Sequence, residues 1–268
     1  MTEAEWLSSN DPDTLLRYLH GRRAAGAVRW LVWLGFGKAP VEEAGRERAS
    51  ERKRRLFACA CCRRIERLFL DERSLAAVEA AERYADGLLG EWARQEAEEA
   101  ARAALAQVQA SSGIGTDPTG LLLSGSMRGT RPAQLAAFAA AEAVGTTPCE
   151  AAAGAAVAAA TQAAIELGDA KWAAAALGAV PRAALLREIF GNPFRPPAAD
   201  PAWLSWNDGT VRRLAEAIYA ERRFADLPIL ADALEEAGCA DAALLDHLRG
   251  PGPHVLGCWA LDALLQKE

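Results

Sequence analysis

Two pairs of cysteine and histidine residues have the spacing of metal ligands. Cys59 and Cys62 are three positions apart, so on a helix their side chains face the same way. His254 and Cys258 are four positions apart and would do the same on a helix near the end of the chain. Two helices that each supply two sulfur or nitrogen donors suit tetrahedral Zn²⁺. The sequence therefore offers zinc as a candidate cofactor.

The same residues also have an interpretation without metal. A free cysteine is commonly a small buried hydrophobic residue. The two pairs lie far apart in the sequence, and the glycines of a zinc knuckle are missing. His254 at a helix start could bond within its own turn, whereas Cys239 and His247 are further donors near the second pair. Both interpretations stay open, and no cofactor is required by the sequence.

Catalytic chemistry is harder to assemble from these residues. The chain has only three histidines, and no serine lies in a nucleophile elbow. A dyad of Cys258 and His247 can be drawn, but the sequence supplies no evident orienting acid or oxyanion hole. We assign no catalytic residue and expect a non-enzymatic protein.

A basic segment at 46–67 indicates a second kind of chemistry. It holds nine Lys or Arg against three Glu, a local charge of +6 in a chain of net charge −6. Such a helix could lie against phosphates, with Arg54, Arg55, Arg63 and Arg64 as the contacts.

Ion pairing within the chain is the alternative for this segment. The rest of the chain then carries −12, and the expected acidic neighbours are Glu79, Glu82 and Glu98. An acidic chain also argues against a protein that coats nucleic acid. Nucleic acid is therefore the less favoured partner.

An aromatic face is predicted within residues 22–49. Trp30 and Trp33 are three positions apart, and Phe36 follows at the same spacing. If this face is exposed, it is a binding patch for a protein partner. If it folds back, it belongs to the core, where tryptophan is commonly found.

The elements that must position these residues are helices. Apolar residues recur at helical spacing over 46–70, 71–88 and 91–110, while alternating β-branched segments are absent. We predict an all-α array of short, antiparallel-packed helices. The last helix is predicted from His254 to about Leu265.

Two irregular segments interrupt the helices. A Gly/Ser-rich stretch at 111–131 is a candidate linker or mobile loop, dividing an N-terminal helical region, 1–110, from a C-terminal one, 132–268. The Pro-rich segment 191–201 cannot be helical. We expect it to wrap over the second region, with Phe194 and Trp203 as anchors.

The composition is that of a globular protein. Hydrophobic residues make up 51% and charged residues 25% of the 268 positions. The acidic N-terminus lacks the basic start of a signal peptide, and no apolar run reaches the ~20 residues of a transmembrane helix. We expect a cytoplasmic protein with no membrane contact and six reduced cysteines.

Several longer motifs are familiar. They are Cys-Ala-Cys-Cys-Arg-Arg at 59–64, Gly-Asn-Pro-Phe-Arg-Pro at 191–196, and Gly-Pro-Gly-Pro-His-Val at 250–255 followed by Gly-Cys-Trp at 257–259. With these motifs the chain resembles a large set of paralogous proteins of planctomycete bacteria, over most of residues 1–20, 50–90 and 185–268. The resemblance implies a bacterial cytoplasmic protein and implies no activity. Residues 22–49 look like an insertion that most members lack.

The sequence as a whole favours a helical protein-interaction or scaffold protein with an unidentified protein partner. Two alternatives follow from the residues above. One is a zinc-stabilised regulatory or structural protein, and the other is a nucleic-acid-associated protein that acts through the basic helix.

Overall fold

The computed structural model describes residues 1–20, 49–111, 130–146 and 150–267. Helices account for all the regular secondary structure in these ranges, so the all-α prediction is confirmed. Alanine, leucine, glutamate and arginine favour helix and dominate the long segments. Side-chain caps begin many of the helices: Asp11, Ser50, Asp71, Asp169, Asp200 and Asp241 each accept a backbone N–H in the first turn.

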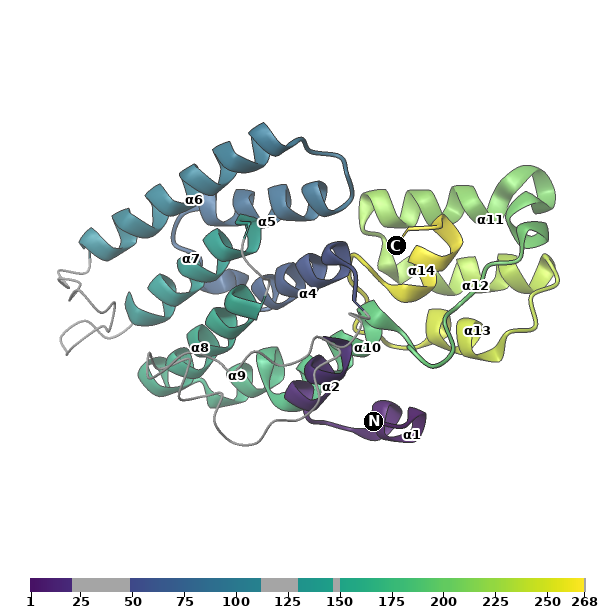
Figure 1. Cartoon of the computed structure of the whole chain (residues 1–268), viewed down its shortest axis with the longest axis horizontal. Helices are drawn as coiled ribbons and strands as arrows, with labels where there is room; N and C mark the ends of the chain where they lie inside the picture. The colour runs from purple at the N-terminus through teal and green to yellow at the C-terminus, as the bar shows by residue number, and fades with distance from the viewer. Residues whose placement is uncertain (21–48, 112–129, 147–149, 268) are drawn as a thin grey trace.

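The helices form two groups along the chain (Figure 1). The first group consists of α1 (Glu3–Ser8), α2 (Pro12–Leu19), α4 (Glu51–Arg63), the 3₁₀ helix η1 (Glu66–Leu68), α5 (Glu72–Ala85), α6 (Glu91–Ser111), α7 (Thr130–Val144), α8 (Glu150–Leu167), α9 (Ala170–Leu177) and α10 (Ala179–Phe190). The second consists of α11 (Pro201–Glu221), the 3₁₀ helix η2 (Phe224–Asp226), α12 (Leu227–Glu236), α13 (Ala242–Arg249) and α14 (Trp259–Leu265).

Each group has its own hydrophobic core. One cluster of buried residues runs from Trp6 to Phe190, and the other from Val211 to Leu264. The helices α6 and α7, which flank the Gly/Ser-rich stretch, pack against each other within the first cluster. The core is therefore divided at the Pro-rich segment and not at 111–131, because the alanine faces of α6 and α7 bury each other.

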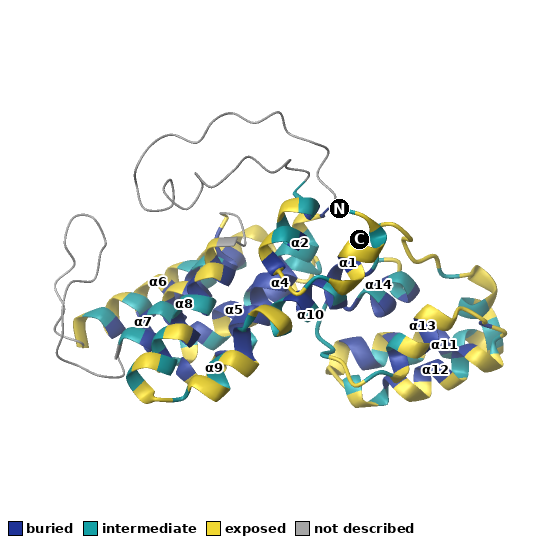
Figure 2. Cartoon of the chain, turned by 90° about the horizontal axis from the view of Figure 1, so that it is seen from below, coloured by how far each residue is buried: buried dark blue, intermediate teal, exposed yellow. Residues whose placement is uncertain are grey.

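The cysteine-rich helix α4 lies at the centre of the first group. All residues from Arg55 to Cys62 are buried, because α5, α7, α8 and α10 contact it from several sides. Alanine and cysteine side chains are small enough to let these helices approach closely. Buried residues of α4, α10 and α14 gather where the two groups meet (Figure 2).

A buried ion-pair network joins the two groups. The Arg52 guanidinium on α4 donates to both carboxylate oxygens of Asp262 on α14, at 2.7 and 2.9 Å, and to Asp86 at 2.9 Å. The Tyr219 hydroxyl accepts from Arg52 and donates to Asp86. Lys267 lies 3.3 Å from Asp86. A bidentate pair of this kind fixes both distance and orientation, so it sets α14 against α4.

The turn before α14 differs from the prediction. The last helix begins at Trp259 and not at His254, because Gly257 adopts a φ of 85°, which a right-handed helix does not allow. A Cβ atom on Gly257 would lie 2.8 Å from the Leu56 side chain, so this close approach requires glycine. His254 and Cys258 therefore do not share a helix face.

The Pro-rich segment also contacts the first group. Phe194 stacks on Tyr18 of α2 with ring centroids 5.3 Å apart, whereas Trp203 packs on the second hydrophobic cluster. The prediction that Phe194 anchors this segment on the second group is wrong, because the Tyr18 ring offers it a flat apolar face. The segment thus bridges the two cores.

Breaking the ion pair should destabilise the protein strongly. In Asp262→Ala the buried Arg52 keeps only part of its partners, and we expect the free energy of unfolding to fall by about 3 kcal/mol, the lower end for a broken buried pair. Urea denaturation followed by circular dichroism measures this. Asp246→Ala, an exposed position on α13, is the matched control and should change stability by less than about 0.5 kcal/mol. Equal effects of the two substitutions would contradict the assigned role.

Candidate metal centre

Four side chains that can hold a metal ion converge where the two groups of helices meet. Glu188 comes from α10, His247 from α13, His254 from the turn after it, and Cys258 from the residue before α14. One ligand atom from each lies within 4.8 Å of all the others. Glu188 is far in the sequence from the other three donors, so the packing of α10 against the second group brings it to them.

The spacing of the donors is close to that of a tetrahedral site. His247 Nε2 is 3.3 Å from Cys258 Sγ and 3.4 Å from a Glu188 oxygen. His254 Nδ1 is 3.3 Å from the other Glu188 oxygen. With zinc bonds of about 2.0–2.3 Å, neighbouring donors in a tetrahedron lie about 3.3–3.8 Å apart. Small side-chain movements would therefore bring all four onto one ion.

His254 has the hydrogen bonding typical of a metal ligand. Its Nε2 lies 3.1 Å from the carbonyl oxygen of Gly250, to which it can donate a proton. That bond leaves Nδ1 directed at the cluster, as in metal sites where a carbonyl orients the ligating ring. Burial alone lowers the pKa of His254, but the Glu188 carboxylate and the Gly250 carbonyl outweigh it, and the pKa is raised. When it is protonated, His254 forms an ion pair with Glu188, whose carboxylate oxygen lies 3.3 Å from Nδ1.

His247 has a different partner on its outer nitrogen. The indole N–H of Trp259 lies 3.3 Å from His247 Nδ1 and can only donate. In this geometry Nδ1 accepts, and Nε2 carries the proton towards Glu188 and Cys258. Burial lowers the pKa of His247, opposed by Glu188 and assisted by His254. A metal on Nε2 requires the proton to move to Nδ1, which breaks the contact with Trp259.

Cys258 is the most deeply buried donor, with no exposed surface. Burial raises the pKa of its thiol well above the ordinary value, and the Glu188 carboxylate acts in the same direction. Backbone N–H groups of Leu261 and Ala260 in α14 act in the opposite direction. A thiol in this position is neutral by itself and becomes a thiolate when a cation supplies the missing charge.

The geometry does not suit a cysteine nucleophile. In a nucleophile–histidine–acid triad, the acid bonds the ring nitrogen that faces away from the nucleophile. Here both Glu188 and Cys258 face Nε2 of His247, and Trp259 occupies Nδ1. The dyad of Cys258 and His247 drawn from the sequence is thus present as a contact, but its acid is on the wrong side for that chemistry.

A cavity of about 890 Å³ opens beside the cluster. Glu188, His247 and His254 form part of its wall, and Trp6 and Trp259 contribute aromatic surface. Cys258 is not among the lining residues. A metal ion would be reached through this cavity from the side of the two histidines.

The other predicted zinc ligands lie elsewhere. Cys59 and Cys62 are buried in the core of the first group, where the Cys59 sulfur lies 3.9 Å from the Val78 carbonyl oxygen. Cys239 is buried in the second core. The structure brings His254 and Cys258 together with His247 and does not bring Cys59, Cys62 or Cys239 to them. The five cysteines of the described ranges form no disulfide with one another.

Glu188 is the ligand that the sequence analysis missed. It follows Leu185, Leu186 and Arg187 on α10 and precedes Ile189 and Phe190, and its side chain is only 3% exposed. A charged residue within such an apolar stretch is a signal, since carboxylates are rarely buried without a partner. Its histidine partners come from a distant turn, which the sequence alone does not place.

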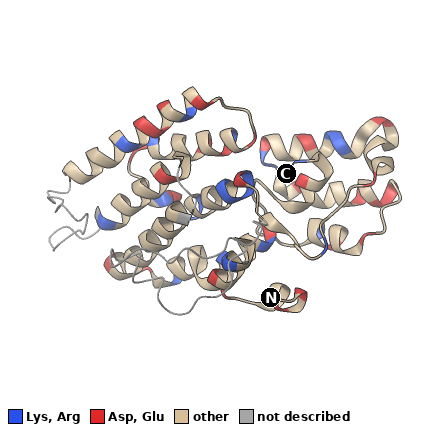
Figure 3. Ribbon diagram, in the orientation of Figure 1, with Lys and Arg blue, Asp and Glu red and all other residues tan. Residues whose placement is uncertain are grey.

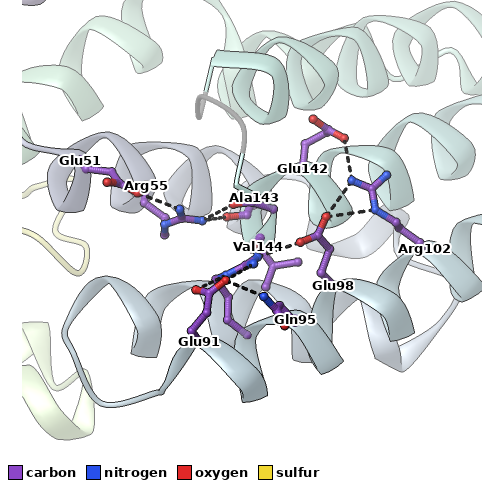
Figure 4. Close-up of polar contacts among 11 residues, drawn as sticks. Glu51, Arg55, Glu91, Gln95, Glu98, Arg102, Glu142, Ala143 and Val144 are labelled. Carbon is purple, nitrogen blue, oxygen red and sulfur yellow. Dashed lines mark hydrogen bonds and ion pairs between the residues drawn. The ribbon is translucent and has the colours of Figure 1, made fainter.

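The four arginines proposed for nucleic acid lie on or just after α4, and Figure 3 shows acidic residues on the helices around it. Arg55 is buried and donates to the carbonyl oxygens of Ala143 and Gly145, at the end of α7, where Arg94 also donates to Val144 (Figure 4). Two guanidinium groups thus satisfy the negative end of that helix.

Arg63 makes two hydrogen bonds to the buried Glu82. This is the internal pairing that was the alternative to nucleic-acid binding. Arg54 and Arg64 are half-buried. The aromatic residues Trp30, Trp33 and Phe36 lie outside the described residues.

No family model, curated protein or solved structure matches the chain. The resemblance to the planctomycete proteins therefore stays a prediction. Among the helices of the described ranges, none is both long enough and apolar enough to cross a membrane.

The His254–Glu188 pair should make the metal-free protein less stable as the pH rises above neutrality. Because the folded pKa of His254 is raised above the unfolded value of about 6.5, its contribution is complete below that pH and is lost as the pH rises through the folded value. His247, whose folded pKa is lowered, binds more protons in the unfolded state near pH 6.5 and so acts in the opposite direction there, and this effect is common to the wild type and to a His254 variant.

Urea midpoints of chelator-treated protein between pH 6.5 and 8 test this expectation. The midpoint of the wild type should decrease over the range, and that of His254→Gln should change less. Parallel pH profiles for the two proteins would show that the pair contributes nothing.

Proposed function

We propose that this protein is a zinc-stabilised structural protein in which one ion joins the two groups of helices. The observation that carries the proposal is the convergence of Glu188, His247, His254 and Cys258 on one point. One thiolate, one carboxylate and two imidazoles match the donors that Zn²⁺ prefers over harder cations. The thiolate and the carboxylate also balance the charge of a divalent ion.

The position of the cluster supports a structural role. Glu188 belongs to α10 in the first group, whereas the other three donors belong to the second. An ion held between them crosslinks residues separated by the Pro-rich segment. Four protein donors complete a tetrahedral shell, which is the usual composition of structural zinc sites.

Zinc content and stability test the proposal. Protein purified without chelator or metal-affinity resin should contain about one zinc per chain. At free zinc one hundred times the dissociation constant, the ion should add about 2.7 kcal/mol to the free energy of unfolding. Cys258→Ser and His254→Gln should lose both the zinc and this gain.

Two buried cysteines provide matched controls. Cys62→Ser and Cys239→Ser remove a thiol from each of the two cores without touching the cluster. Both variants should retain about one zinc per chain, even if their free energy of unfolding is lower than that of the wild type. Protein that binds no zinc at micromolar free metal, or whose zinc is lost equally in Cys62→Ser, would overturn the assignment.

Trp259 should oppose metal binding, because its N–H faces the nitrogen that must be protonated when His247 binds zinc. Trp259→Phe removes this donor and keeps most of the ring. We expect zinc affinity to rise by up to about tenfold, as for the removal of one competing neutral hydrogen bond. Competition with a chromophoric chelator measures the affinity, and Trp203→Phe is the control. A fall in affinity would mean that the indole supports the metal-bound state.

The interaction or scaffold function predicted from the sequence is compatible with this role. A helical array presents broad surfaces, and a crosslink between its two groups would hold them in one arrangement. Binding to nucleic acid receives less support, because Arg55 and Arg63 are engaged within the chain.

A further inference from the structure

The wall of the cavity beside the cluster includes Arg187, which has no carboxylate partner among the described residues. Arg187, half-buried on α10, lines this cavity next to Glu188. Its guanidinium donates to the backbone carbonyl oxygens of Trp6, at 2.9 Å, and Ser9. Among the described residues, no carboxylate lies within ion-pair distance of it. Burial lowers the pKa of Arg187, and no acidic group offsets that effect.

The other charged residues of the cavity wall are already matched. Glu3 pairs with Arg195 at 2.8 Å and accepts from Asn192. Asp241 accepts the backbone N–H groups of the first turn of α13. Glu188 is occupied by the histidines. Arg187 is therefore a cation of the cavity wall that no carboxylate of the described residues pairs with, whereas the carboxylate of Asp241 is turned to the backbone of α13.

Arg187 also keeps unused donors. A guanidinium has five N–H bonds in one plane, and two of them are used by the carbonyls of Trp6 and Ser9. These two carbonyls hold the group in place at the wall. A fixed arginine with free, coplanar donors is suited to carboxylate and phosphate oxygens, which it binds with two parallel hydrogen bonds.

The size and walls of the cavity fit a small organic molecule. Its volume of about 890 Å³ lies within the range of sites for such ligands, which are mostly apolar with a few polar groups. Trp6, Trp259 and Pro253 supply the apolar surface. We propose that this cavity binds a small organic oxyanion, a carboxylate or a phosphate monoester, through the Arg187 guanidinium. The proposal goes beyond the zinc site and does not require it.

Binding of three ligands with the same ring tests the proposal. Benzoate and phenyl phosphate carry the two kinds of oxyanion, and benzamide is the neutral counterpart. Calorimetric titrations at low ionic strength use the full chain, once treated with chelator and once loaded with zinc. Both anions should bind in both preparations, at least about tenfold more tightly than benzamide. The anion that binds with the higher affinity indicates whether the natural ligand is a carboxylate or a phosphate monoester.

Variants of Arg187 locate the site. Arg187→Gln should lose at least about tenfold in affinity for the anions, and Arg187→Lys, which keeps the charge without the planar fork, should lie between it and the wild type. Arg182→Gln, on the same helix but outside the cavity wall, is the control and should bind normally. If Arg187→Gln does not fold, the test uses the affinity of Arg187→Lys for the anions and the difference in affinity between benzoate and benzamide.

Three results would overturn the proposal: no binding of either anion, equal binding of benzoate and benzamide, or unchanged binding in Arg187→Gln. Anion binding confined to zinc-loaded protein and unaffected by Arg187→Gln would assign the anion to the metal instead. Absence of zinc together with anion binding that depends on Arg187 would remove the zinc proposal and leave this one standing.

Discussion

The bidentate pair between Arg52 and Asp262 is the interaction on which the arrangement of the two helical groups depends. The side chain of Asp262 is 2% exposed and that of Arg52 is 12% exposed, so the loss of either leaves a charge in contact with little water. The pair can form only when α14 lies against α4 in one orientation, and Tyr219 and Asp86 close the network around it. Hydrophobic contact alone would leave that orientation free, because apolar surfaces attract without direction. The ion pair is directional and therefore orients α14 relative to α4.

The candidate metal centre is a consequence of this orientation. Once α14 is set against α4, the residue before it, Cys258, faces α10, and Gly257 packs against Leu56. Glu188 then meets the histidines of the second group. The cluster combines a buried carboxylate, a buried thiol and two imidazoles of opposite pKa shift. Hydrogen bonds among these four side chains satisfy some of their polar atoms. A divalent cation would satisfy more of them, because it takes the place of the protons that the thiol and the histidines otherwise carry.

The sequence predicted the helices far better than their assembly. Periodicity and caps identified the helical segments, since these signals are local. His254 and Cys258 were recognised as donors, and His247 as a neighbour. Their partner was wrongly sought in Cys59 and Cys62, because same-face spacing on a helix does not distinguish a ligand pair from a buried apolar stripe. The sequence did not indicate Glu188, because its contact with His254 joins residues that are 66 positions apart. The start of the last helix was misplaced for a related reason, because Gly257 packs against Leu56, a residue distant in the sequence.

The arginines of α4 also have partners that the sequence does not reveal. The basic segment of α4 has the composition of a phosphate-binding helix, yet three of its guanidinium groups bind within the fold. Arg52 binds Asp262, Arg55 binds the end of α7, and Arg63 binds Glu82. Arg187 has no such carboxylate among the described residues. Two backbone carbonyl groups hold its guanidinium at the wall of the cavity instead. The density of charge along a sequence does not show which arginines the fold uses internally, because their partners lie far away in the sequence.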